Sequence, residues 1–393
     1  MGELKGVNVQ KLQGGLGRSN GNKDNHVAIV LVGIPAGPIA DAVNNSGKGV
    51  VITSVYDAEV LGINESFDAN NTLKVHDQIK EFFRLSPEAT LYLFNSDVTA
   101  DLKAFLNYNK DIKGYGLNVA YNDGVPNVVS EITKHQGIVT DFAAENRLID
   151  FAIIGMDDLD DFATDLFGQT AGNVSICVAC ETGDGKVSIG SALGMLAIRR
   201  VNENLGSVDI QDKPRAKRGT IDYTLTDSVK ERWLSSYLSD GREVASVSNS
   251  ELQSIISKGY IIAAGYEGYS GVFFENSYTC IERASDFAQI ENNRVWNKAA
   301  RLIRTTLLPR VKGVVKKNPT TGFIASTTVS SWKQLMNKAL ETMVVANEIS
   351  GYEVDIDPAQ EVNAANPVVV KASIVADGIV HEFDVAIGLT NSI

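Results

Sequence analysis

Two cysteines at C-x-x-C spacing are the first residues in this sequence whose types could do chemistry. Cys177 and Cys180 lie in "CVAC", a spacing that serves redox exchange when the thiols sit at the start of a helix. The surrounding "VSICVACET" (174–182) predicts a strand instead, and residues three apart on a strand point to opposite faces. We therefore expect buried structural cysteines. With Cys280 the chain has 3 cysteines, too few for a disulfide framework.

Glycine-rich segments are the second candidate, because their backbone N–H groups can cradle phosphates. "GGLGRSNG" (14–21) comes before the first expected strand, where a dinucleotide loop would have to follow it. "GIPAGP" (33–38) does follow that strand, but Pro35 and Pro38 remove N–H groups that a cradle needs. Neither segment carries the G-K-[ST] ending of a P-loop, so we expect no nucleotide cofactor.

The remaining catalytic and metal-binding residue types form no constellation. No histidine belongs to an H-E-x-x-H motif, and "GYSG" (268–271) fits a turn better than a nucleophile elbow. The run "DDLDD" lacks the glycine and the final glutamate of a calcium loop. We expect no catalytic residue, cofactor or metal ion, and interpret the run as an acidic surface. Its aspartates are Asp157, Asp158, Asp160 and Asp161.

Charge is distributed unevenly along the chain. The formal net charge is −12, yet residues 292–340 hold ten Lys or Arg and no Asp or Glu. Residues 141–168 show the opposite bias, with eight Asp or Glu against the single Arg147. Complementary patches on one chain would let copies of it dock on each other. Two solvated faces are the alternative that composition alone leaves open.

The basic stretch begins with an amphipathic pattern. "IENNRVWNKAARLIRTTLLP" (290–309) predicts a helix that ends before Pro309. At 100° per residue its basic side chains share an arc of roughly 120°, with Trp296 on the opposite, core-facing side. Such a stripe suits nucleic acid, an anionic membrane or an acidic protein, and a sequence pI near 4.9 favours the protein. The four basic residues are Arg294, Lys298, Arg301 and Arg304.

The elements around these residues divide the chain. Over 26–206, apolar strands such as "HVAIVLVGIP" (26–35) alternate with helical patterns such as "LKVHDQIKEFFRLS" (73–86). This alternation predicts an α/β domain with a mostly parallel sheet. Further helices are expected at "LDDFATDLFGQ" (159–169) and over 190–206. The 393 residues suffice for two or three domains, and no apolar run is long enough to span a membrane.

The second half has a different texture, which predicts an α+β domain over 207–378. A strand pair with a glycine-rich turn precedes two helices, and Asp377-Gly378 predicts a hairpin turn near the end. In the last strand Phe383, Val385 and Ile387 alternate with acidic residues, so one face is expected to be buried. The polar residues 1–25 are expected to form an extended arm, and 379–393 a terminal strand or arm.

At this point the chain resembles contractile phage tail sheath proteins. The resemblance is most specific over about 260–390, in "SDFAQIENNRVWNKAAR" (285–301), the Leu308-Pro309 turn and the "NPTTG" loop (318–322). It matches a family pattern of S-D-[YF]-x-x-I-x-x-x-R, R-x-x-x-K-A-x-R and N-P-x-T-G. The C-terminal "ISGYEVDIDP" and "VAIGLTN" are similar as well, and so is the start "VAIVLVGIPAGP". The short length resembles a compact sheath of Mu-like phages or phage-tail-like injection systems.

The resemblance implies a structural protein rather than an enzyme. Sheath subunits form hexameric rings that stack around an inner tube and contract, while terminal arms add strands to neighbouring subunits. The implied partners are other copies of the chain, an inner tail tube protein, and baseplate and tail terminator proteins. Neither nucleic acid binding nor membrane insertion is implied. The implied location is a virion tail or tail-like particle assembled in a bacterial cytoplasm.

Three alternatives remain open from the sequence. One is another tail or secretion-sheath component assembled by the same logic. A second is an α/β ligand- or nucleotide-binding enzyme that uses residues 26–206. A third is a nucleic-acid binder that uses 292–340 and would show salt-sensitive affinity.

Overall fold

The computed structural model describes residues 23–385, except for 97, 122–126, 364–365 and 382. These residues divide into two compact units, Met1–Arg294 (unit 1) and Val295–Ile393 (unit 2), which are described separately below. The expected arm over 1–25 lies outside the described residues except for Lys23–Asn25, which form the short 3₁₀-helix η1. Within the described residues, no helix is long and apolar enough to cross a membrane.

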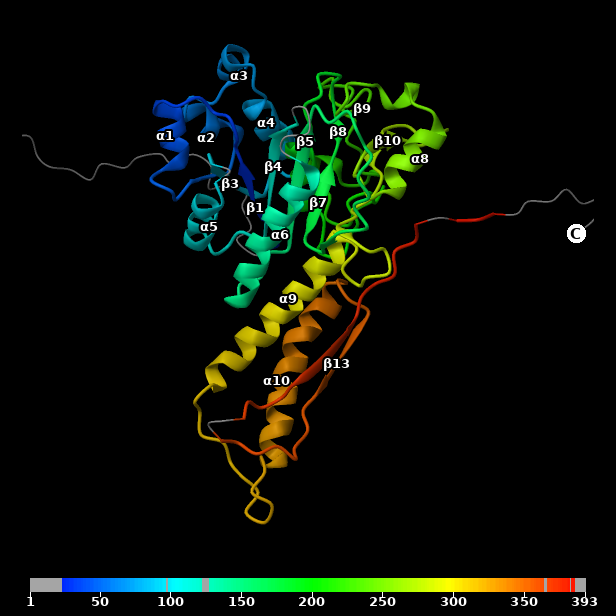
Figure 1. The fold of residues 1–393 in the computed structure, drawn as a ribbon. Helices are drawn as coiled ribbons and strands as arrows, with labels where there is room; N and C mark the ends of the chain where they lie inside the picture. The colour runs from blue at the N-terminus through cyan, green and yellow to red at the C-terminus, as the bar shows by residue number, and fades with distance from the viewer. Residues whose placement is uncertain (1–22, 97, 122–126, 364–365, 382, 386–393) are drawn as a thin grey trace, which may run out of the picture. The chain divides into compact units, whose positions relative to one another are not determined.

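A six-stranded sheet with the order β2-β3-β1-β4-β5-β7 forms the centre of unit 1 (Figure 1). All neighbouring pairs are parallel except β2 with β3, which confirms the mostly parallel sheet expected from the sequence. Such a sheet needs apolar residues on both faces because helices cover both. The strands are β1 His26–Val30, β2 Val50–Ile52, β3 Thr90–Phe94, β4 Gly114–Ala120, β5 Phe151–Asp157 and β7 Val174–Cys177.

Helices cover the two faces of this sheet. Val27 and Ile29 of β1 join the apolar cluster of α4 and α7, whereas Ala28 and Val30 join that of α5 and α6. The alternation follows from the period of two along a strand. The helices of unit 1 are α1 Pro38–Asn44, α2 Val55–Val60, α3 Glu65–Asn71, α4 Val75–Leu85, α5 Thr99–Tyr108, α6 Val128–Ala144, α7 Ile189–Ile198 and α8 Asn249–Ser257.

Helix α7 packs directly on the backbone of α4. A Cβ at Gly190 would lie 2.1 Å from the carbonyl oxygen of Gln78, so any larger residue would collide with backbone there. Gln78 reinforces the contact, since its Nε2 donates to the carbonyl of Val187 at 2.8 Å. The glycine therefore sets the close approach of the two helices.

Two helices expected from the sequence differ in the structure. Residues 159–169 contain no helix, although Leu159, Phe162 and Leu166 are buried at helical spacing. They pack one by one instead, as when Phe162 meets the edge of Tyr260 with ring centroids 5.6 Å apart. The helix expected over 190–206 ends at Ile198, because Arg199 turns to an extended backbone with ψ 148°.

Residues 207–294, expected to begin a second domain, pack into unit 1. Tyr223, Trp233 and Phe274 belong to the same apolar cluster as β1. The expected strand pair is present, with β10 antiparallel to β11. The short strands of this region and its partners are β6 Thr170–Ala171, β8 Ala179–Cys180, β9 Tyr237–Leu238, β10 Ala263–Gly265, β11 Val272–Phe274 and β12 Cys280–Ile281.

The cysteines are buried and free, as expected, but Cys177 and Cys180 belong to the same apolar cluster and not to opposite faces, because the strand expected over 174–182 is interrupted at Val178. Cys177 ends β7 and Cys180 ends β8, and neither is accessible to solvent. Burial raises the pKa of the Cys177 thiol to about 12, so the reactive thiolate is suppressed. Within the described residues no group of three or more His, Cys, Asp or Glu side chains could hold a metal ion.

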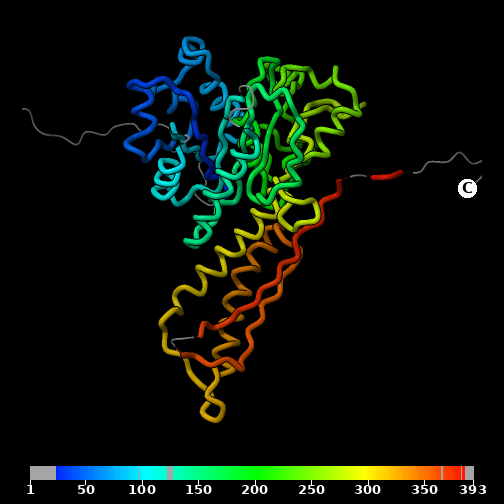
Figure 2. Tube along the Cα trace, in the orientation of Figure 1, coloured from blue at the N-terminus to red at the C-terminus, as the bar shows by residue number. Residues whose placement is uncertain are grey.

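Unit 2 is built from two long helices and a two-stranded sheet. Helix α9, Ile290–Leu307, begins in unit 1 and leads through η4, Leu308–Arg310, to α10, Ser326–Val345. Strands β13, Gly351–Asp355, and β14, Lys371–Val375, pair antiparallel, and the red β14 runs beside the orange β13 in Figure 2. The hairpin predicted at Asp377-Gly378 is wrong, because β14 pairs with β13 and the described residues 379–381 and 383–385 form no strand.

Candidate interaction surfaces

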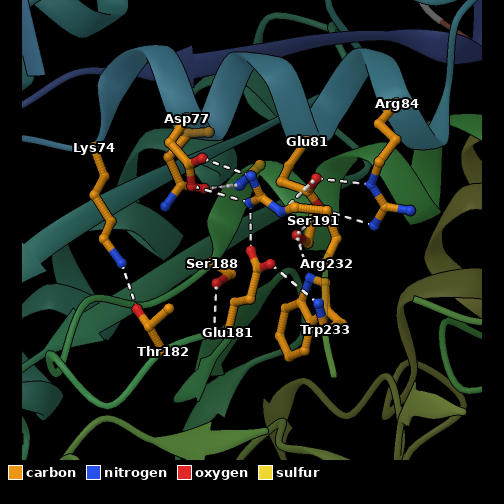
Figure 3. Close-up of polar contacts among 12 residues, drawn as sticks. Lys74, Asp77, Glu81, Arg84, Glu181, Thr182, Ser188, Ser191, Arg232 and Trp233 are labelled. Atoms are coloured by element: carbon orange, nitrogen blue, oxygen red, sulfur yellow. Dashed lines mark hydrogen bonds and ion pairs between the residues drawn. The ribbon is translucent and has the colours of Figure 1, made fainter. Parts of the chain in front are cut away.

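The charged cluster in unit 1 that most resembles an active site is centred on Arg232 (Figure 3). Its Nη1 lies 2.7 Å from Oδ1 of Asp77 and its Nε lies 3.1 Å from Oε1 of Glu81. Glu181 forms a third ion pair with it. Burial alone would lower the pKa of Arg232, but the surrounding carboxylates outweigh burial and raise it above its ordinary value. The arginine is therefore firmly charged.

The network continues beyond the ion pairs of Arg232. Oε1 of Glu181 accepts from the backbone N–H of Trp233 at 3.1 Å, and the indole N–H of Trp233 donates to Ser191 Oγ at 3.1 Å. Arg84 holds both oxygens of Glu81, at 2.7 and 2.8 Å. The carboxylates of Asp77, Glu81 and Glu181 are thus paired with arginines of the same chain. The network docks the segment around Trp233 onto α4 and α7, which is a structural task.

A cavity of about 290 Å³ at the carboxyl ends of β1, β4 and β5 is where the enzyme alternative would place a ligand. Asp157 is the carboxylate in its lining, and its Oδ1 accepts from Asn118 Nδ2 at 2.6 Å and from the N–H of Val187 at 2.9 Å. Burial raises the pKa of Asp157 to about 6. The oxygen that would anchor a ligand is thus already engaged by the protein.

The basic stripe predicted on the helix is wrong for its first member. Arg294 is only 2% exposed, and its guanidinium donates to the carbonyls of Arg199 and Arg200 at 3.3 Å each. Trp296, expected to face the core, is 48% exposed. The first turn of α9 is buried by polar contacts: Asn293 Nδ2 donates to the Gly172 carbonyl at 2.7 Å. A hydrophobicity pattern cannot detect burial of that kind.

The other three basic residues of the stripe differ in environment. Nζ of Lys298 lies 2.5 Å from Oε1 of the buried Glu348, so its charge is neutralised within unit 2. Arg301 is half-buried, and Arg304 is exposed. More positive charge lies beyond the helix, in the loop between α9 and α10. Its exposed lysines are Lys312, Lys316 and Lys317.

The acidic run after β5 also separates into buried and exposed members. Asp157 is buried, so the expected acidic surface does not include it. Asp158 is exposed and pairs with Lys186 at 2.6 Å. Asp160 and Asp161 are exposed, and neither forms an ion pair with any residue that the structure describes.

Unit 2 has an incomplete sheet, and apolar side chains in the segment that follows its last strand are exposed. Among the described residues, β13 and β14 pair only with each other, so each has one edge without a strand. Phe383 and Val385, predicted to lie on an inter-subunit strand, are 82% and 70% exposed. Ile387, the third residue of that prediction, lies outside the described residues.

Comparison with known proteins defines the family. The family model described as "DUF2586, N-terminal domain" matches residues 4–278, and "DUF2586, C-terminal domain" matches residues 286–393. The chain belongs to the DUF2586 family. No curated protein matches this DUF2586 chain in sequence.

Solved structures share the fold of this DUF2586 protein. A chain of the six-fold symmetrised anti-feeding prophage baseplate is 12% identical, with a TM-score of 0.60 over 99% of this chain and 100% of that one. A chain of the same baseplate in its contracted state is 12% identical, with a TM-score of 0.56 over 100% and 99%. The sheath tail protein DSY3957 from Desulfitobacterium hafniense is 10% identical, with a TM-score of 0.49 over 94% and 100%. The fold assignment rests on the two baseplate chains.

Proposed function

We propose that this protein is the structural subunit of a contractile tail sheath or of a closely related part of a contractile injection system. It assembles as stacked hexameric rings around an inner tube, and contraction drives the tube through a target envelope. The fold shared with anti-feeding prophage baseplate chains over nearly the whole chain supports this role. The particle is assembled in the bacterial cytoplasm, with baseplate and terminator proteins at its ends, and the subunit has no catalytic role.

The observation that carries the proposal is the incomplete sheet of unit 2. A two-stranded sheet is marginal by itself in water, and an open edge is a template for another strand. Phe383 and Val385 lie two residues apart, so in a strand they would share one face. Burying them in a neighbouring copy would contribute roughly 1.5–3 kcal/mol each. Strand addition between copies fits this arrangement.

Attachment to an acidic tube is reassigned to the cations that are exposed. Arg304 and the loop lysines Lys312, Lys316 and Lys317 replace the buried Arg294 and the paired Lys298 in this role. A surface ion pair contributes about 0–1 kcal/mol, which is weak enough to exchange during contraction. Because the same ion pairs recur in every subunit of a ring, their summed free energy is large enough to hold the sheath on the tube.

Sedimentation velocity of purified variants tests the strand addition. Phe383→Asp with Val385→Asp removes the apolar face, and we expect loss of large assemblies because charges cannot be buried between copies. Asp384→Ser is the matched control and should assemble like the wild type, because in an added strand Asp384 would lie on the face opposite Phe383 and Val385. Equal assembly of all three proteins would contradict the proposed role of this segment.

A further inference from the structure

A second basic cluster lies in unit 1, away from the helix that the sequence emphasised. Arg215, Lys217 and Arg218 are exposed on and after the 3₁₀-helix η2, Arg215–Lys217. None of the three forms an ion pair with any residue described by the structure. Their neighbours differ, since Lys213 pairs with Asp209 and Arg200 pairs with Asp212 at 2.9 Å. Three cations are therefore left without an ion-pair partner in the part of the chain that the structure describes.

This basic cluster (Arg215, Lys217 and Arg218) lies at the amino edge of the central sheet. Arg215 and Arg218 line a cavity of about 500 Å³ together with Asn25 and Glu88. Asn25 directly precedes β1, and Glu88 lies two residues before the start of β3. Because β1, β3, β4 and β5 run parallel, their amino ends share one edge of the sheet.

The acidic pair Asp160 and Asp161 follows the opposite edge. It comes three and four residues after the end of β5, at the carboxyl side of the sheet. The nearby Lys186 forms its ion pair with Asp158. Asp160 and Asp161 are exposed and form no ion pair with any described residue. A seven-residue strand spans roughly 20 Å, which keeps the two patches apart within one copy.

We propose that the basic cluster of one copy binds the acidic pair of the next copy. When two copies share one orientation, the basic cluster of one faces the acidic pair of the other. Such a head-to-tail contact can repeat along a polymer, whereas a two-fold contact closes as a dimer. The net charge of −12 makes nucleic acid a less suitable occupant of the basic cluster. The role of this contact, to join identical subunits in a polymer, rests on the proposed function. The choice of residues rests on the charge pattern alone.

Charge reversal with mixing tests the contact in the full-length protein. Arg215→Glu with Arg218→Glu leaves the acidic pair intact, and Asp160→Lys with Asp161→Lys leaves the basic cluster intact. We expect each variant alone to lose self-association at low salt, measured by sedimentation velocity, because like charges then face each other. An equimolar mixture should recover it, since every contact in an alternating chain again joins opposite charges. High salt should weaken wild type and mixture alike.

Lys312→Glu with Lys316→Glu is the control variant, because it makes the same charge change in the loop of unit 2. Alone and without a tube protein it should self-associate like the wild type, because it keeps both the basic cluster and the acidic pair. Circular dichroism melts establish that each variant is folded. Folded reversal variants that associate like the wild type, or a mixture that fails to recover, would overturn the contact. So would a labelled DNA duplex that binds the wild type and not the arginine variant.

The same series separates this inference from the proposed function. Tubes that form equally well with all charge variants would overturn the contact and leave the sheath role intact. Association that reversal abolishes and mixing restores, without rings or tubes, would support the contact and count against the sheath role.

Discussion

The guanidinium of Arg294 donates to the backbone carbonyl of Arg199, 3.3 Å away in the interior of unit 1. Burial lowers the pKa of Arg294 from its ordinary value. Nearby carboxylates, including Asp150 and Glu291, partly offset this because their negative charge favours the charged guanidinium. The residue that the sequence placed on a solvent-facing stripe instead anchors the first turn of α9. That contact holds the first turn of α9 to the rest of unit 1.

Replacing Arg294 should therefore destabilise the protein without touching any exposed surface. We expect Arg294→Ala to lower the free energy of unfolding by about 2–4 kcal/mol, because two buried carbonyls lose their donor and a cavity remains. Arg304→Ala, an exposed change on the same helix, should cost less than about 0.5 kcal/mol. Urea unfolding followed by circular dichroism measures both. Equal effects would contradict the anchoring role.

The Arg232 network predicts a second stability effect. Arg232→Ala would leave the buried Glu81 and the partly buried Glu181 without their shared cation, and we expect a loss of about 3–5 kcal/mol. Arg242→Ala breaks pairs of a more exposed arginine and should cost about 1 kcal/mol or less. Chemical unfolding monitored by tryptophan fluorescence compares the two, since Trp233 is buried within the network. A cost near that of the exposed control would show that the network is dispensable.

Lys298 and Glu348 give a prediction for unit 2. Their 2.5 Å contact joins α9 to the segment after α10, and Glu348 is buried. A double-mutant cycle with Lys298→Met and Glu348→Gln should yield a coupling free energy of about 1–3 kcal/mol. A coupling free energy near zero would contradict the neutralisation of Lys298 by Glu348 and would make Lys298 a candidate for tube binding again.

Asp157 predicts a pH dependence of stability. Burial raises its pKa from 3.8 to about 6, so the folded state holds this proton more tightly than the unfolded state does. The stabilisation is complete below pH 4 and is lost as pH rises through 6, by up to about 3 kcal/mol. Asp157→Asn should gain stability relative to the wild type across this range. Parallel stability profiles of the two proteins between pH 4 and 7 would refute the assignment.

Apolar periodicity predicted the elements whose burial is apolar. Ile79 and Phe82 defined α4, and the apolar run of β5 identified a buried strand, because in both cases hydrophobic contacts decide the fold. The resemblance to tail sheath proteins rested on ordered motifs, and the fold shared with the baseplate chains agrees with it.

The errors arose where polar contacts or distant pairing decide the structure. Arg294 and Asp157 are charged residues held inside by hydrogen bonds, which no hydrophobicity pattern detects. Leu159 and Phe162 have helical spacing but pack individually in an irregular segment. The turn signal at Asp377-Gly378 is local, whereas β14 pairs with β13 across a long connection. The cluster around Arg215 was visible as "PRAKRG" (214–219), but its importance depends on which edge of the sheet carries it.

Negative-stain electron microscopy of the purified wild-type protein, at increasing concentration and low salt, tests the central claim most directly. We expect six-fold rings or hollow tubes whose number rises with concentration. Uniform small particles at every concentration, with or without an added tube protein, would contradict the claim that this DUF2586 chain is a self-assembling sheath subunit.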